Sequence, residues 1–271
     1  MQNPNSPPSH ASPTLNPYKT LPFQPHFKPQ KLQHMRNQVE NNFSEFFEKW
    51  ILQHEANLQQ LLSVSKNPSN EQEQRVLISK VTTHYKEYYS AKWAAAKEDV
   101  LGFFSPPWLT PLENAYLWMT GWKPSLAFRL LDSVRYTGVP GSSLADMSGE
   151  QLKKIEDLRV KIKVEEEKVE REMERQQVAM ADRRMVELAQ LTSRVRDGVG
   201  EIDGLVEVAL KGLLVGLERV MKMGDCVRLK TLKWVFEVLT PLQCVDFMAA
   251  ASMLQIQLRK WGKNRDSQQG S

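Results

Sequence analysis

The chain has 271 residues, of which 41% are hydrophobic and 25% are charged, proportions typical of a globular protein with a sizeable core. The formal net charge is +4, but residues 1–40 hold four basic side chains against Glu40 alone, so the rest of the chain is nearly neutral. Such a body lacks the strongly basic face that supports bulk electrostatic binding of nucleic acid, and it leaves only a local patch for that role.

Two cysteines, Cys226 and Cys244, are too few for a disulfide framework and stand in no metal-binding spacing. We therefore expect an intracellular, reducing compartment. No apolar run approaches the roughly 20 residues of a membrane span. The N-terminus has no basic start followed by an apolar stretch, so a secretory signal is not expected.

Residues 1–37 contain eight of the fifteen prolines, and we expect a disordered tail because such a segment buries too little apolar surface to offset its ordering entropy. Two helices should follow, since apolar residues recur at helical spacing. Their apolar positions are Phe43, Phe46, Phe47, Trp50, Ile51, Leu58, Leu61 and Leu62 in the first, and Tyr85, Tyr88, Tyr89 and Trp93 in the second. Pro68 and Ser69 are expected to separate them, and Gly102 to lie near the end of the second.

The stretch "LTPLENAYLWMTGWKPS" (residues 109–125) begins with helix-start signals. Thr110 is a good N-cap, Pro111 a good first helical residue, and Glu113 completes a capping box. The same signals return at residues 239–243, "LTPLQ", so two helices should begin in the same way. The two segments diverge after the cap, and we infer no internal duplication.

Trp118 and Trp122 are four residues apart, which predicts one helical face. Gly121 should interrupt this helix and Pro124 should start another, giving a helix–elbow–helix unit. Aromatic residues at helical spacing more often belong to a core, but a partly exposed aromatic surface could instead bind a partner or an apolar ligand. The candidate partner-binding residues are Trp108, Trp118, Trp122, Lys123, Pro124 and Ser125.

A long charged helix is predicted to begin after Ser148. Sixteen of the residues 153–175 are charged, eight of each sign, and such a helix is stabilised by ion pairs one turn apart. We interpret Glu165, Glu166 and Glu167 as part of a solvated face and not as a carboxylate site. Its thin apolar seam comprises Leu152, Ile155, Leu158, Ile162, Val169, Met173 and Met180.

The seam predicts docking of this helix on a partner helix. We take Ile155, Ile162 and Val169 as candidates for self-association into a homodimer. Replacing Ile155 and Ile162 with Glu should abolish a dimer if the seam is intermolecular, and should unfold the domain if the seam packs within the chain.

Apolar helices at about 201–222, 226–239 and 240–261 close the chain, before a short disordered tail at 263–271. No segment alternates with the period of a strand. The sequence therefore predicts an all-α fold, a multi-helix bundle with one long, charged, coiled-coil-like helix, over residues 38–262.

No catalytic or metal-binding constellation is apparent. Three of the five histidines lie in the tail, and His54 and His84 have no ligand partner one turn away, so we interpret both as satisfied structural or surface residues. There is no glycine-rich phosphate loop and no nucleophile elbow. The chain is therefore expected to have no enzymatic activity and no metal.

Several segments resemble the plant delay-of-germination family: "FSEFFEKWILQHEANLQQLL", "HYKEYYSAKWAAAKEDVLGFFSPPWLTPLENAYLWMTGWKPSLAFRLLDSV" and the "MSGEQL" that opens the long helix. A similar domain forms the C-terminal half of TGA-type bZIP transcription factors. The resemblance covers residues 38–262. It implies a helical, nuclear, non-enzymatic regulator of seed dormancy and abscisic-acid signalling that binds type 2C protein phosphatases and bZIP-type transcription regulators.

The chain also departs from this pattern. The basic region and leucine heptads of the TGA factors have no counterpart before residue 38, so a bZIP grip on DNA is absent. The resemblance also implies haem binding through histidines near the C-terminus, but no histidine follows His84, and Cys244 is not followed by proline. No cofactor is therefore predicted. Direct, sequence-specific DNA binding by the helical domain and sensing of an apolar ligand or haem remain the alternatives.

Overall fold

The computed structural model describes residues 29–68, 70–194 and 200–269, and the predicted tail up to residue 28 lies outside them. These ranges hold helices, turns and one isolated bridge, between Trp118 and Gly121, but no strand. The all-α prediction is confirmed. Within the same ranges no helix has both the length and the apolar character needed to cross a bilayer.

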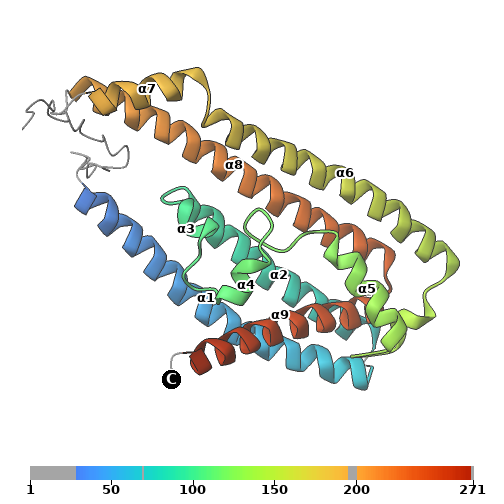
Figure 1. The fold of residues 1–271 in the computed structure, drawn as a ribbon. Helices are drawn as coiled ribbons and strands as arrows, with labels where there is room; N and C mark the ends of the chain where they lie inside the picture. The colour runs from blue at the N-terminus through green and yellow to red at the C-terminus, as the bar shows by residue number, and fades with distance from the viewer. Residues whose placement is uncertain (1–28, 69, 195–199, 270–271) are drawn as a thin grey trace, which may run out of the picture.

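The helices follow one another along the chain (Figure 1). They are α1 (Pro29–Lys66), α2 (Glu71–Ala96), α3 (Leu101–Phe104), α4 (Pro111–Ala115), α5 (Leu126–Thr137), the 3-10 turn η1 (Ser143–Asp146), α6 (Gly149–Ala179), α7 (Arg183–Arg194), α8 (Gly200–Val238) and α9 (Pro241–Gln269).

Several boundaries differ from the sequence prediction. Helix α1 begins at Pro29 and α9 continues to Gln269, so parts of both predicted tails are helical. Helix α8 is continuous where two helices were expected. Gly224 does not break it, and this glycine lets the chain at Met119 approach closely, because a Cβ at Gly224 would lie 3.3 Å from the Cβ of Met119. Asn70 caps α2 by accepting a bond from the backbone N–H of Glu73, and Ser69, predicted to separate the first two helices, lies outside the described residues.

Two groups of helices form the body (Figure 1). The long helices α6 and α8 run antiparallel and pack along each other, while α9 packs against both α1 and α2. Short helices α4 and α5 and the elbow between them connect the two groups. Buried residues of α5, α6, α8 and α9 form one hydrophobic cluster, and those of α1 and α2 contribute to two more.

The apolar seam of α6 belongs to this core, except that Met180, directly after the helix, is 62% exposed. Ile155, Ile162 and Val169 are at most 3% exposed and share a cluster with Val220 and Val227 of α8. The expected intermolecular role for these three side chains is therefore wrong, because α8 of the same chain already covers them. The helix-start prediction is confirmed: Ser148 and Gln151 form a capping box at the start of α6.

Candidate functional site

The elbow begins with the predicted cap of α4. The Thr110 side chain accepts a bond from the Glu113 backbone, and the Glu113 carboxylate accepts from the Thr110 backbone at 2.8 Å. Arg259 of α9 donates to the same carboxylate at 3.3 Å and to the Trp108 carbonyl at 3.0 Å. This buried arginine therefore fixes the start of α4 against the last helix.

The tryptophans of the elbow do not share a helical face, because α4 ends at Ala115. Trp118 and Gly121 instead exchange two backbone hydrogen bonds across a tight turn. Its central residues, Met119 and Thr120, have φ angles of 44° and 61°. Residues other than glycine rarely adopt this left-handed backbone conformation. It costs about 1–3 kcal/mol per residue and persists only where the surrounding structure enforces it.

Two buried cations enforce the turn. Arg228 of α8 donates to the carbonyls of Trp118 and Met119 and, at 2.6 Å, to that of Trp122. Lys92 of α2 donates to the Thr120 carbonyl at 3.0 Å. We call these two residues, together with the Asp225 that joins them, the carbonyl clamp.

Asp225 makes the clamp one unit. Its carboxylate lies 2.8 Å from the Lys92 ammonium and 2.6 Å from the Arg228 guanidinium, and it accepts a further bond from the Trp93 indole at 2.9 Å. All three clamp residues are at most 1% exposed. Burial lowers the pKa of Lys92 to about 8, against the opposing effect of Asp225. Removing Asp225 would leave two buried cations without their anion, and breaking a buried ion pair in this way typically costs about 3–5 kcal/mol.

The other side of the elbow is attached to α6. Glu170 accepts bonds from the Trp118 indole at 2.9 Å and from Lys123 at 2.8 Å. Glu166 accepts from the Ser125 backbone at 2.6 Å. The expectation of a solvated carboxylate is wrong for Glu166, which is 3% exposed and whose pKa is raised by burial.

The structure thus brings five of the six candidate partner-binding residues together, but uses them inside the chain. Trp108 lies apart from the other five, in the loop between α3 and α4, where its ring is buried against Phe43 and Phe103. Pro124 is buried and Trp118, Trp122 and Ser125 are half-buried. Lys123 keeps 40% of its side chain exposed but is paired with Glu170. The elbow is therefore a joint between helices, with little free surface to offer a partner.

His54 and His84 are buried, in agreement with the structural role expected as one alternative. Their hydrogen-bonding capacity, however, is not fully used. Their rings stack on Trp50 with centroid distances of 4.8 and 4.6 Å. Among the described residues, neither ring nitrogen of His54 has a hydrogen-bond partner, and Nε2 of His84 has none. Burial lowers the pKa of His54 to about 3, with a smaller contribution from His84. The described residues contain no cluster of three or more metal-ligating side chains.

The haem ligands implied by the family resemblance do not fit this chain. Cys244 is 3% exposed, and burial raises the pKa of its thiol to about 12, which opposes the thiolate form needed for ligation. Neither Cys244 nor the two core histidines line either of the two pockets described next.

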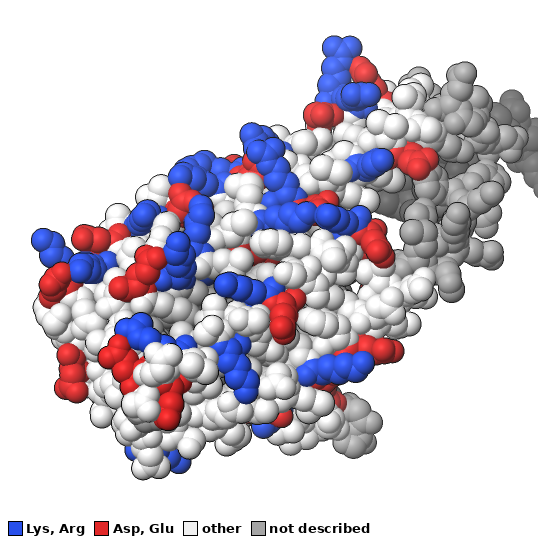
Figure 2. Space-filling model, turned by 180° about the vertical axis from the view of Figure 1, so that it is seen from behind, with Lys and Arg blue, Asp and Glu red and all other residues white. Residues whose placement is uncertain are grey.

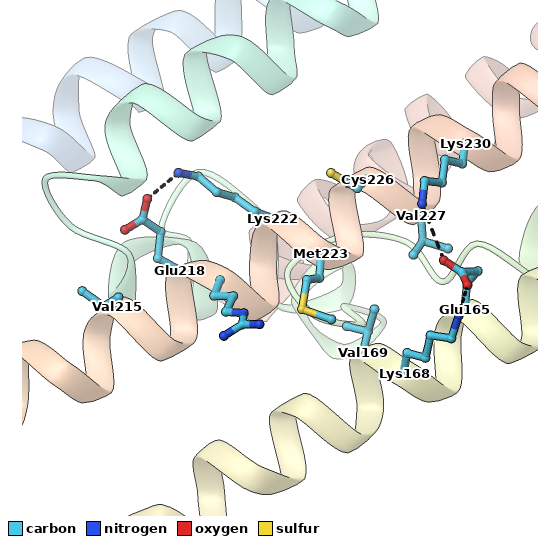
Figure 3. Close-up of a pocket in the computed structure, with 11 residues that line it drawn as sticks. Glu165, Lys168, Val169, Val215, Glu218, Lys222, Met223, Cys226, Val227 and Lys230 are labelled. Atoms are coloured by element: carbon cyan, nitrogen blue, oxygen red, sulfur yellow. Dashed lines mark hydrogen bonds and ion pairs between the residues drawn. The ribbon is translucent and has the colours of Figure 1, made fainter.

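Among the described residues, two cavities are large enough to hold a ligand or part of a partner. A groove of about 500 Å³ runs between α6 and α8, and Figure 3 shows its apolar floor and charged rim. A second pocket of about 290 Å³ lies between the elbow, α2, α8 and α9. Its walls are mainly aromatic and aliphatic, and Lys92, Asp225 and Arg228 are among its lining residues.

Charge on the surface is mixed. Figure 2 shows acidic and basic side chains interspersed over one face, without a broad field of either sign. This pattern on the face shown agrees with the nearly neutral body and gives no phosphate-binding stripe there.

Sequence reasoning missed the carbonyl clamp and the groove. One signal was present: Asp225 and Arg228 have opposite charges and are three residues apart, a spacing that allows an ion pair within one helix. Lys92 was visible only as the basic residue after the tyrosine pair.

Comparisons with known proteins identify the relatives of this chain. A family model described as DOG1, seed dormancy control, matches residues 54–133. The chain is 55% identical to Protein DOG1-like 4 of Arabidopsis thaliana, covering 85% of this chain and 96% of that protein. It is 29% identical to Protein RESPONSE TO ABA AND SALT 1 of the same plant, over 83% and 96%. It is 27% identical to Transcription factor TGA2.3 of Oryza sativa subsp. japonica, over 79% of this chain and 61% of that protein. The chain belongs to the DOG1 family.

Proposed function

We propose that the chain is a non-enzymatic regulator of seed dormancy and of the abscisic-acid response that acts in the nucleus by binding other proteins. The family description and the name of the relative that responds to abscisic acid and salt support the biological role. Similarity to TGA factors supports a setting in transcription regulation. The partners we propose are type 2C protein phosphatases and bZIP-type transcription regulators.

The observation that carries the binding role is an exposed apolar surface. The end of α6, helix α7 and the first half of α8 project beyond the rest of the bundle as an arm (Figure 1). Large apolar side chains on this arm are 46–66% exposed: Val178, Met180, Val186, Leu191, Leu205, Val208, Leu210 and Val215. A concentration of such side chains marks a protein-interaction surface more often than a free surface.

A direct binding experiment tests this proposal. The full chain would be titrated by calorimetry with a purified type 2C phosphatase and, separately, with a purified bZIP factor. We expect saturable binding to at least one of them. A chain that is folded by circular dichroism but binds neither class would overturn the proposal.

The pocket beside the carbonyl clamp favours a second candidate, sensing of a small apolar ligand. Its volume lies near the lower end for ligand sites, and its lining combines apolar walls with a few polar groups, as such sites do. A ligand that binds only the folded state raises the melting temperature, and the shift grows with the logarithm of the ligand concentration once this exceeds the Kd. A panel of small apolar compounds that produces no such shift would remove this candidate.

A further inference from the structure

We infer that the groove between α6 and α8, continued by the exposed face of α8, binds an acidic amphipathic helix of a partner protein. This inference rests on the proposed function and specifies the chemistry of the partner. We use the term docking face for the groove together with the stripe of α8 defined below.

One face of α8 is largely exposed to solvent between residues 205 and 230. Its members recur every three, four or seven residues, which places them in one stripe: Leu205, Val208, Val215, Arg219, Lys222, Cys226 and Lys230. A Cβ added at Gly212, in the same stripe, would meet no atom within 4 Å. By contrast, a Cβ at Gly216 would collide with Gln176 of α6, so the adjacent face is the packed one.

The apolar part of the docking face can accept a helix. Val169, Met223 and Val227 form the floor of the groove, and Val215 stands 56% exposed at its end (Figure 3). The stripe extends this apolar surface toward the arm through Val208, which is 64% exposed. From residue 205 to residue 230 the stripe is about 37 Å long at 1.5 Å per residue. A surface of this length, apolar from Leu205 to Val215 and along the floor of the groove, can accept the apolar face of an amphipathic helix.

The rim of the groove selects an acidic partner. Four basic residues, Lys168, Arg219, Lys222 and Lys230, stand against Glu165 and Glu218. Glu165 is shared by Lys168 at 2.5 Å and Lys230 at 3.6 Å, and Glu218 is paired with Lys222 at 2.5 Å.

Arg219 forms no ion pair with any described residue, so the rim has an excess of positive charge. Carboxylates flanking the apolar stripe of a bound helix would neutralise this excess, and charge complementarity of this kind favours the correct partner over others.

The probe is a fluorescein-labelled helical peptide of about 18 residues, with leucines on one face and glutamates beside them. A matched peptide carries lysines in place of the glutamates. Fluorescence anisotropy with the full chain should show saturable binding of the acidic peptide. The lysine peptide should bind at least about tenfold more weakly, and the difference should shrink as salt rises from about 50 to about 300 mM.

Two variants locate the site, each with a matched control. Val215→Asp disrupts the apolar stripe, and its control Val160→Asp changes a similarly exposed valine on the far side of α6. Arg219→Glu reverses the free charge, and its control Arg129→Glu makes the same change at an exposed position of α5. The groove variants should weaken peptide binding at least about tenfold, whereas the controls should leave it unchanged. All four should keep the helical circular dichroism of the parent chain.

Cys226 supplies an independent readout, because it is exposed in the groove while the other cysteine, Cys244, is buried. Bound acidic peptide should slow the reaction of the Cys226 thiol with a thiol reagent. Equal binding of the two peptides, or equal binding by groove and control variants, would refute the inference. A dimer of the chain that dissociates in Val215→Asp would also refute it, since the occupant would then be a second copy.

The same variants separate this inference from the proposed function. Partner proteins that bind the parent chain and the groove variants equally would leave the regulatory role intact and exclude the docking face. A parent chain that binds neither partner class would contradict the regulatory role, whatever the peptides do.

Discussion

The buried histidine on α1 gives a prediction whose size follows from the structure. His54 is 0% exposed, its ring nitrogens have no hydrogen-bond partner in the part of the chain that the structure describes, and its pKa is lowered to about 3 from the ordinary 6.5. In the unfolded chain the ring takes up a proton as the pH falls below about 6.5, but in the folded chain it stays neutral. Stability is therefore lost as the pH falls from about 6.5 toward 3.

The magnitude can be tested with His54→Phe, which keeps an aromatic ring against Trp50 and removes the titrating group. Between about pH 7.5 and pH 5, His54 should cost the parent chain about 2 kcal/mol of unfolding free energy. Urea unfolding followed by far-ultraviolet circular dichroism at both values gives this difference. Burial also lowers the pKa of His84, which acts in the same direction in both proteins. If the parent and the variant lose equal stability over this range, His54 is not held neutral by burial.

Three further predictions concern the bundle. Gly121→Ala should cost at least about 2 kcal/mol of stability, because its Cβ would lie 2.6 Å from the Arg228 guanidinium carbon and displace this side chain from the turn. Gly212→Ala should instead add about 0.5–1 kcal/mol of stability through helix propensity, because the space around Gly212 is open. Chemical denaturation of both variants measures this contrast, and equal effects would show that the carbonyl clamp does not hold the turn. Ile155→Glu combined with Ile162→Glu should abolish helical circular dichroism, whereas a folded monomer would contradict burial of the seam. Ser148→Ala should lower the unfolding free energy by about 1 kcal/mol through loss of the α6 cap, and an unchanged denaturation midpoint would speak against that cap.

The sequence predicted best the features that depend on neighbouring residues. The helix starts at Thr110 and Thr240 depend on side chains three residues away, Glu113 and Gln243, and both sets of capping bonds are present. The all-α class follows from helical periodicity. The predicted apolar seam of α6 is also found, with Ile155, Ile162 and Val169 buried in one cluster. What periodicity could not decide was whether the seam meets the same chain or another, because α8 and a second copy would offer similar apolar surfaces.

The elbow could not be predicted for a different reason. Its left-handed turn is held by Arg228, more than 100 residues away in sequence, and by Lys92. Spacing alone therefore favoured one helical face for Trp118 and Trp122, and tertiary hydrogen bonds overrode it. The elbow residues were predicted to bind a partner because aromatic side chains are concentrated there. Aromatic side chains pack inside a protein as readily as they bind partners.

Regulation by contact with other proteins is tested most directly by a capture experiment. The full chain, Val215→Asp and Val160→Asp would be immobilised separately and exposed to nuclear extract of maturing seeds, with bound proteins quantified by mass spectrometry. We predict enrichment of type 2C phosphatases or bZIP factors on the parent chain and on Val160→Asp, and its loss on Val215→Asp. Absence of both protein classes from the folded parent chain would contradict the claim.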